Sequence, residues 1–417
     1  MNLVRTSVYS SFSTALRIIS AFIVNKLVAV YVGPAGLTVI GNFQNGINIL
    51  LGLSTCSINA GVVKYTAEYS GKPERLKSLF STSFRIIFIS SSTVGLTSIL
   101  FASYFAKKIL QDGEFAYLFV LLGLTIFLYA FNVLILAVLN GKKEIVKFTQ
   151  ANILSGILSL LITSGFIYWK HLTGALISIV ITQSTFFFLS FYLISKCDWF
   201  SFSSFFGKVS REVANKLFRY TAMGITSAVA GPLSLLFIRN YIIKKVSIEG
   251  AGYWEGISRI SSVYLMMITS SLAIYYLPKL SETQSNREVR HEITSGFKLI
   301  MPIILGMSLV IYFLRNLIIR VLFTGQFGPM EELFFFQLTG DVIKVGSWLL
   351  AFLMLAKAMA RVFIITEIVF SLTYFLLSIF FISHYGLIGV TYAYTINYSL
   401  YFITCYLILH KKFAIKE

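Results

Sequence analysis

Long apolar segments recur along the whole chain, and short stretches of polar and charged residues separate them. A helix needs about 20 apolar residues to cross the hydrocarbon core of a bilayer, and each segment is long enough to do so. The pattern predicts an all-α polytopic membrane protein with twelve transmembrane helices. The predicted spans lie near residues 8–30, 37–59, 79–102, 116–139, 146–168, 172–195, 217–241, 254–277, 296–320, 334–358, 361–382 and 386–409.

Composition excludes a soluble globular protein. Of the 417 residues, 57% are hydrophobic and 12% are charged, and the mean hydropathy is +0.80. The net charge of +18 would suggest a nucleic-acid partner for a soluble protein. Most cations lie between the predicted spans, where membrane topology and contact with anionic lipid head groups explain them. We therefore expect anionic membrane lipids, and no nucleic acid, as partners.

The distribution of Lys and Arg between the loops predicts the orientation. With a cytoplasmic amino terminus, 22 of the 35 Lys and Arg residues lie in cytoplasmic loops or at cytoplasmic ends. Positive residues accumulate on the cytoplasmic side of membrane proteins. Both termini are therefore predicted to be cytoplasmic.

A weak internal repeat predicts two lobes of six helices. At an offset of 216 residues, Ala35-Gly36 corresponds to Ala251-Gly252, and several loops align as well. Parallel repeats of this kind place a substrate site between the two halves, near the middle of the membrane. The predicted lobes are residues 1–200 and 217–417, and residues 201–216 form a cytoplasmic connecting segment.

The apolar span at residues 334–358 contains two charged residues well inside its length. Asp341 and Lys344 are three positions apart, so they share one face of the predicted helix. Charged groups at this depth are costly unless they face water or an opposite charge. The pair therefore indicates either a polar path through the membrane or a structural ion pair that holds this helix to its neighbours.

Other polar residues recur at helical spacing within the spans, which indicates faces turned toward water or protein. Hydrogen bonding between helices is the alternative explanation for the asparagines of the second span. Lys26 has the alternative of extending to the outer interface. The candidate cavity residues from this pattern are Arg17, Lys26, Gln44, Asn48, Arg85, Arg259 and Lys344.

The charges of these residues indicate a class of ligand. Four or five buried cations stand against two carboxylates well inside spans, Asp341 and Glu367. Excess positive charge favours a polyanion such as a diphosphate. Asp341 and Glu367 are the candidate proton carriers, and permanent ion pairing explains them equally well. Gly231 and Pro232 form a candidate hinge in the seventh span, because proline removes a backbone hydrogen bond and bends a helix.

The sequence lacks the motifs of several enzyme classes. Its three cysteines and four histidines are scattered, without the spacing of metal ligands or of a disulfide framework. The phosphate-binding motif GxxxxGK[ST] and the hydrolase motifs HExxH and GxSxG do not occur. We therefore expect no enzyme, no metal and no organic cofactor, but a secondary transporter with proton or sodium coupling.

Five short motifs carry a family resemblance: VGPAGL at residues 32–37, Asn42-Phe43, GVVKY at 61–65, GDVIKVG at 340–346 and AKA at 356–358. They resemble the bacterial Wzx-type O-antigen and lipid III flippases of the multidrug/oligosaccharidyl-lipid/polysaccharide exporter superfamily. The resemblance implies the fold of multidrug and toxin extrusion transporters, with two six-helix lobes around a cationic cavity. It also implies a flippase for undecaprenyl-diphosphate-linked oligosaccharides in the inner membrane of a Gram-negative bacterium.

The resemblance extends to single residues. Those that occupy matching family positions are Lys26, Lys64, Asp341, Lys344 and Glu367. Lys64 joins the candidate cavity through this match. Arg17 stands where lipid III flippases have a lysine, and Gln44-Asn45 replaces a more basic pair. These differences favour O-antigen units as the cargo, moved from the cytoplasmic to the periplasmic leaflet by alternating access.

Three alternatives accompany this prediction. The first is a lipid III flippase, since the motifs resemble both O-antigen and lipid III flippases. A cation-coupled multidrug exporter would share the fold, but the positive cavity disfavours it. A membrane glycosyltransferase or polymerase would need a sizeable external domain, and every predicted outer loop is short. A flippase would have the polymerase and the chain-length regulator of the same pathway as partners.

Overall fold

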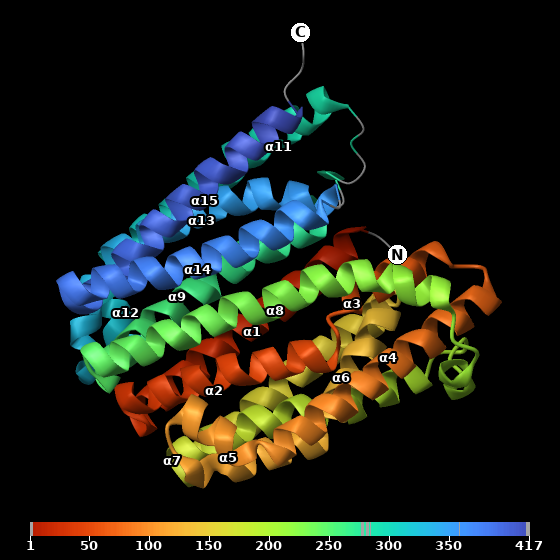
Figure 1. Cartoon of the computed structure of the whole chain (residues 1–417), viewed down its shortest axis with the longest axis horizontal. Helices are drawn as coiled ribbons and strands as arrows, with labels where there is room; N and C mark the ends of the chain where they lie inside the picture. Colours follow the sequence, from red (N-terminus) through yellow and green to blue (C-terminus); the bar gives the residue numbers. More distant parts are fainter. Residues whose placement is uncertain (1–2, 277–278, 281–282, 284, 358, 414–417) are drawn as a thin grey trace. The chain divides into compact units, whose positions relative to one another are not determined.

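The protein is helical along nearly its whole length. The computed structural model describes residues 3–413 apart from 277–278, 281–282, 284 and 358, and no strand occurs among the described residues. The side chains of residues 3–14, 17, 219, 273–274 and 412–413 also lie outside the description. Figure 1 shows the long helices. The predicted all-α class is therefore confirmed.

The long helices are α1 (Leu3–Tyr31), α2 (Gly33–Ser54), α4 (Pro73–Leu100), α6 (Ala116–Gly141), α7 (Ile145–Ser195), α8 (Arg211–Lys245), α9 (Ile248–Ser271), α11 (Asn286–Phe313), α13 (Phe334–Ala356), α14 (Ala360–Tyr385) and α15 (Gly389–Phe413). The shorter elements are α3 (Asn59–Glu68), α5 (Ala102–Phe105), η1 (Ala106–Leu110), η2 (Gly113–Phe115), η3 (Phe202–Phe206), η4 (Leu272–Tyr276), α12 (Arg315–Leu322), η5 (Gly325–Leu333) and η6 (Gly386–Ile388).

The long helices have the length and hydropathy of membrane spans. Among the described residues, eight helical segments are long and apolar enough to cross a membrane. Two of them, Ile145–Ser195 and Ala360–Lys411, extend over 51 and 52 residues, which is more than one crossing requires. The protein is thus a multi-pass membrane protein. The count of twelve crossings and the cytoplasmic position of the termini stay predictions.

The two longest segments are interrupted where the sequence predicts a boundary between spans. In α7, His171 has φ 49° and ψ −121°, which lies outside the helical region and separates residues 146–168 from residues 172–195. Gly386 has φ 66° and separates α14 from α15. Each long segment therefore consists of two helices, divided at His171 in the first segment and by the short turn η6 in the second.

Several helix boundaries differ from the predicted spans, and two of these differences have a clear local cause. The second span was predicted to reach residue 59, but α2 ends at Ser54 because Cys56 and Ser57 adopt positive φ angles of 46° and 48°. The eighth span was predicted to begin at residue 254, but α9 begins at Ile248. The hydroxyl of Ser247 accepts a hydrogen bond from the backbone N–H of Gly250, 2.9 Å away, and so caps the start of α9.

The first compact unit comprises residues 1–31 and 39–233. Its core is formed by apolar side chains of α3, α4 and α6 and of the segment that follows α7. α4 and α6 approach closely at two glycines. A Cβ on Gly95 would lie 2.7 Å from the Gly123 carbonyl oxygen, and a Cβ on Gly123 would lie 2.5 Å from the Gly95 carbonyl oxygen. Small residues permit this spacing of membrane helices.

Gly123→Ala is expected to lower the free energy of unfolding by about 1–3 kcal/mol, because the new methyl group would meet a backbone oxygen that cannot move aside easily. Gly165→Ala on α7 is the matched control, since no atom lies within 4 Å of a Cβ added to Gly165. Thermal unfolding of the two purified variants in detergent measures the difference. Equal melting temperatures would contradict the close packing of α4 on α6.

The second compact unit comprises residues 32–38 and 234–417. Helix α13 lies at its centre and packs against α11, α14 and α15. The start of α2 belongs to this unit. The Thr38 hydroxyl donates to the Ile248 carbonyl oxygen over 2.7 Å, and a Cβ on Gly252 would lie 2.0 Å from the Pro34 carbonyl oxygen. The glycine is thus needed where α9 meets the start of α2.

The predicted lobe limits and the hinge stay predictions. Residues 201–216 lie within the first unit, where the Phe205 ring is buried against Phe80 and Phe131. The two units divide between residues 233 and 234, one residue beyond Pro232. Helix α8 continues through Gly231 and Pro232, and no atom lies within 4 Å of a Cβ added to Gly231.

Candidate functional site

The carboxyl group of Asp341 joins three helices of the second unit. It is fully buried on α13. Its Oδ2 accepts hydrogen bonds from the Ser261 and Tyr264 hydroxyls of α9, at 2.5 and 2.6 Å. Its Oδ1 accepts from the Tyr394 hydroxyl of α15 at 2.7 Å. Gln337, one turn earlier on α13, contributes a longer contact of 3.4 Å to Oδ1. Hydroxyl donors therefore surround this carboxyl group.

The residue before Asp341 makes this arrangement possible. A Cβ on Gly340 would lie 2.4 Å from Cδ1 of the Tyr394 ring. Any larger residue would push that ring away and would break the hydrogen bond between its hydroxyl and the carboxyl group. The Gly340-Asp341 pair thus provides both the space for Tyr394 and the acceptor that orients it.

Lys344 does not form the ion pair with Asp341 that the sequence allowed. Among the described residues, its Nζ has no carboxylate oxygen within 4.0 Å and no hydrogen bond. It lies instead over three aromatic rings, with centroids at 5.1 Å for Trp348, 5.3 Å for Tyr394 and 4.9 Å for Tyr398. Aromatic faces attract a cation, but they do not cancel its charge. The ammonium group is therefore held in place while its N–H donors stay available.

Tyr394 connects the two charged residues. Its hydroxyl binds the carboxyl group of Asp341, and its ring contacts the ammonium group of Lys344. Glu367, which is partly buried on α14, also lies within the electrostatic field of Lys344. The structure thus brings together three of the predicted residues, Asp341, Lys344 and Glu367. Tyr264, Tyr394, Tyr398 and Trp348 complete the group.

Arg259 belongs to a different group of the same unit. Its Nε lies 2.9 Å from Oε1 of Glu255, and the terminal nitrogen of Arg239 lies 2.5 Å from Oε2 of the same carboxylate. Arg239 also lies over the ring of Trp254, 5.4 Å from its centroid. Glu255 was missed in the sequence. Its position four residues before Arg259 was the available signal, because residues at this spacing meet on a helix.

Lys64 takes part in a cluster of cations and tyrosines in the first unit. Its Nζ donates to the Tyr220 hydroxyl over 3.0 Å and lies 5.6 Å from the ring centroids of both Tyr220 and Tyr65. Lys216 donates to the Tyr69 hydroxyl over 3.1 Å.

This cluster, which also includes Arg75 over the Tyr69 ring, joins α3 to the start of α8. Two carboxylates accompany it: Glu212 pairs with Lys216 at 2.6 Å, and Glu68 acts on Lys64 electrostatically. Only Lys64 of this cluster was predicted from the sequence, because Tyr220 and Lys216 come from a distant helix, α8.

The other predicted residues of the first unit are less enclosed. Gln44 and Asn48 on α2 and Arg85 on α4 are exposed. Lys26 on α1 is half-buried. Arg17 lies on the same helix, but its side chain falls outside the described part of the structure. The shared cavity of these residues stays a prediction.

Known proteins resemble the chain in sequence and in fold. A family model described as polysaccharide biosynthesis protein matches residues 46–332. The lipid III flippases of Escherichia coli strain K12 and of Shigella flexneri are each 29% identical over 409 residues, which is 97% of this chain and 97% of theirs.

Solved structures share the fold at low sequence identity. A multidrug resistance MATE family transporter of the MOP superfamily in the inward-facing conformation has a TM-score of 0.78 at 14% identity, covering 99% of this chain and all of that one. The lipid II flippase MurJ in the inward closed conformation has a TM-score of 0.71 at 15% identity, covering 99% and 89%.

These matches confirm the predicted likeness to the fold of multidrug and toxin extrusion transporters and the resemblance to flippases of this superfamily, whereas the two six-helix lobes and the cationic cavity stay predictions. The family model covers well over half of the chain. The chain therefore belongs to the polysaccharide biosynthesis protein family.

Proposed function

We propose that this protein is a flippase for lipid-linked oligosaccharides and that Lys344 binds the diphosphate of the lipid carrier. The observation that carries the proposal is the ammonium group of Lys344, which three aromatic rings hold inside a membrane helix without an ion pair. A phosphate oxygen is a suitable acceptor for its free N–H donors, because charge-assisted hydrogen bonds are among the strongest in proteins. The lipid III flippases that align with the chain over nearly its whole length support this proposal.

The relatives favour the lipid III alternative over O-antigen units as the cargo. The O-antigen preference rested on Gln44-Asn45 and Arg17 alone, whereas the similarity to lipid III flippases extends over 97% of the chain. Both cargoes share the undecaprenyl diphosphate that the cationic residues would bind. A cargo of the lipid III class in the bacterial inner membrane is therefore our proposal, with the pathway's polymerase and chain-length regulator as partners.

The arrangement disfavours an exporter of organic cations. At this site an organic cation would meet the ammonium group of Lys344, and the Asp341 carboxyl group is fully enclosed by hydroxyl donors. We assign a coupling role to Asp341 and Glu367, since both lie near Lys344 and either can exchange a proton. Alternating access of the antiporter type would then couple proton movement to the transfer of the glycan.

The test is transfer of lipid-linked oligosaccharide in proteoliposomes. A fluorescent lipid-linked glycan from bacterial membranes is placed in vesicles that contain the purified protein, and a membrane-impermeant glycosidase then reports which leaflet holds it. We expect transfer above that of protein-free vesicles, with a change in rate when a proton gradient is imposed. If the mass of the glycan is unchanged in vesicles without the glycosidase, the protein has moved the lipid between leaflets and has not added or removed a sugar. Transfer equal to that of empty vesicles would refute the proposal.

A further inference from the structure

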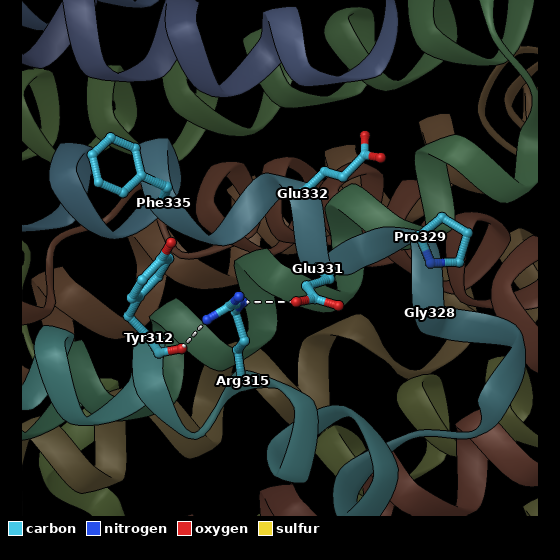
Figure 2. A pocket seen from close by; sticks show the side chains of 7 residues that line it. All are labelled: Tyr312, Arg315, Gly328, Pro329, Glu331, Glu332 and Phe335. Carbon is cyan, nitrogen blue, oxygen red and sulfur yellow. Dashed lines mark hydrogen bonds and ion pairs between the residues drawn. The ribbon is translucent and has the colours of Figure 1, made fainter.

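A pocket of the second unit lies apart from the groups described above. It is formed where α11, α12, η5 and α13 meet, and its volume is about 310 Å³. Figure 2 shows the side chains that line it, among them Tyr312, Arg315, Glu331, Glu332 and Phe335. Pockets for small ligands have volumes of about 300–1,000 Å³, so this one suits a small ligand or one part of a larger ligand.

Arg315 and Glu331 form a fixed polar frame in this pocket. The Nε of Arg315 lies 3.0 Å from Oε1 of Glu331, and another guanidinium nitrogen donates to the Tyr312 carbonyl oxygen over 2.9 Å. The guanidinium also lies 4.5 Å from the centroid of the Tyr312 ring. With its amide group turned to donate, Asn316 binds Oε2 of Glu331 at 2.9 Å. Both charged groups are thus held before any ligand arrives.

Other groups of the pocket are left open. In the described part of the chain, the Glu332 carboxylate and the Tyr312 hydroxyl have no hydrogen-bond or ion-pair partner. The Phe335 ring is 53% exposed and meets the Tyr312 ring edge to face, with centroids 5.9 Å apart. No atom lies within 4 Å of a Cβ added to Gly328. The pocket therefore offers an acceptor, a hydroxyl group and an aromatic face beside open space.

The charges decide which part of a lipid-linked oligosaccharide fits. One guanidinium stands against two carboxylates, so the pocket is negative and repels a diphosphate. The polyprenyl chain is apolar and would leave the Glu332 carboxylate without water or a partner, which is costly. Sugar hydroxyl groups can donate to carboxylates and accept from a guanidinium, and the C–H face of a sugar ring packs on an aromatic ring. The glycan is the part that matches.

We propose that this pocket is a saccharide-binding site for the glycan of the transported lipid. The inference rests on the proposed flippase function. The charge pattern predicts the loop between the ninth and tenth spans to lie outside the cytoplasm. The pocket would then hold the glycan on the side to which it is delivered, separate from the cation that binds the diphosphate.

Saturation-transfer NMR on the full-length protein in detergent tests the site. The probe is the free oligosaccharide released by mild acid from the lipid-linked pool of the source bacterium, and inorganic diphosphate is the competitor. We expect saturation transfer to the sugar protons of the probe. Phe335→Ala should weaken the binding about fivefold through loss of the aromatic contact, and Glu332→Gln should weaken it less. Diphosphate should not compete.

Phe101→Ala is the matched control, because that ring is 54% exposed in the first unit and does not line the pocket. Thermal unfolding confirms that each variant is folded. Absence of binding to the native protein, equal binding by the Phe335→Ala variant, or displacement by diphosphate would overturn the inference. Transfer in proteoliposomes is measured in parallel. If the native protein transfers the lipid but does not bind the glycan, only the proposed pocket is refuted. If the native protein does not transfer the lipid, the flippase function is refuted.

Discussion

Glu255→Ala is expected to lower the free energy of unfolding by about 3–5 kcal/mol, the largest effect on stability that the structure indicates. The Glu255 carboxylate lies between two guanidinium groups, at 2.5 Å from Arg239 and 2.9 Å from Arg259. Arg239 is only 3% exposed. Removal of the carboxylate leaves two like charges close together, one of them deeply buried.

Thermal unfolding in detergent, followed by size-exclusion chromatography with fluorescence detection, measures this effect. Glu249→Ala is the matched control, since Glu249 is exposed near the start of the same helix and makes no ion pair in the described chain. We expect a large fall in melting temperature for Glu255→Ala and almost none for Glu249→Ala. Similar melting temperatures for the two variants would show that the carboxylate does not stabilise the guanidinium pair.

The sequence was sufficient for features that depend on long apolar segments. Each predicted span overlaps a helix, and the division of α7 at His171 falls between the predicted spans 146–168 and 172–195. The burial of Asp341 also followed, because its position inside an apolar span requires protein or water partners. These features are local along the chain, so the sequence contains the information directly.

The partners of the charged residues were less predictable. Trp348 is four residues from Lys344 on the same helix, and this spacing was visible in the sequence. Tyr394 and Tyr398 come from α15, and the packing of α15 on α13 depends on the tertiary fold. For the same reason, the sequence left two interpretations open: an ion pair between Asp341 and Lys344, or a polar path through the membrane. In the structure, hydroxyl groups from α9 and α15 donate hydrogen bonds to the Asp341 carboxyl group instead.

Lys344→Glu is expected to abolish transfer of lipid-linked oligosaccharide, and Lys344→Ala to reduce it strongly. Loss of one charge-assisted contact costs about 1.5–3 kcal/mol, which corresponds to about a 10- to 150-fold loss of affinity. Charge reversal adds repulsion of the diphosphate and places a carboxylate against three aromatic faces, which attract cations. Lys344→Arg keeps the charge over the rings and should retain most of the transfer.

Transfer in proteoliposomes is measured for the native protein and for the Lys344→Glu, Lys344→Ala and Lys344→Arg variants. Lys298→Glu is the matched charge reversal. Lys298 is exposed on α11 of the same unit and lies in none of the groups described above. We expect Lys298→Glu to transfer the lipid at nearly the native rate.

Tyr394→Phe refines the test, because it keeps the ring beside Lys344 but removes the hydrogen bond to Asp341. If Tyr394→Phe binds the lipid normally but loses its response to a proton gradient, then the carboxyl group acts in coupling and the ammonium group acts in binding. Native transfer rates for Lys344→Glu would instead remove Lys344 from the mechanism.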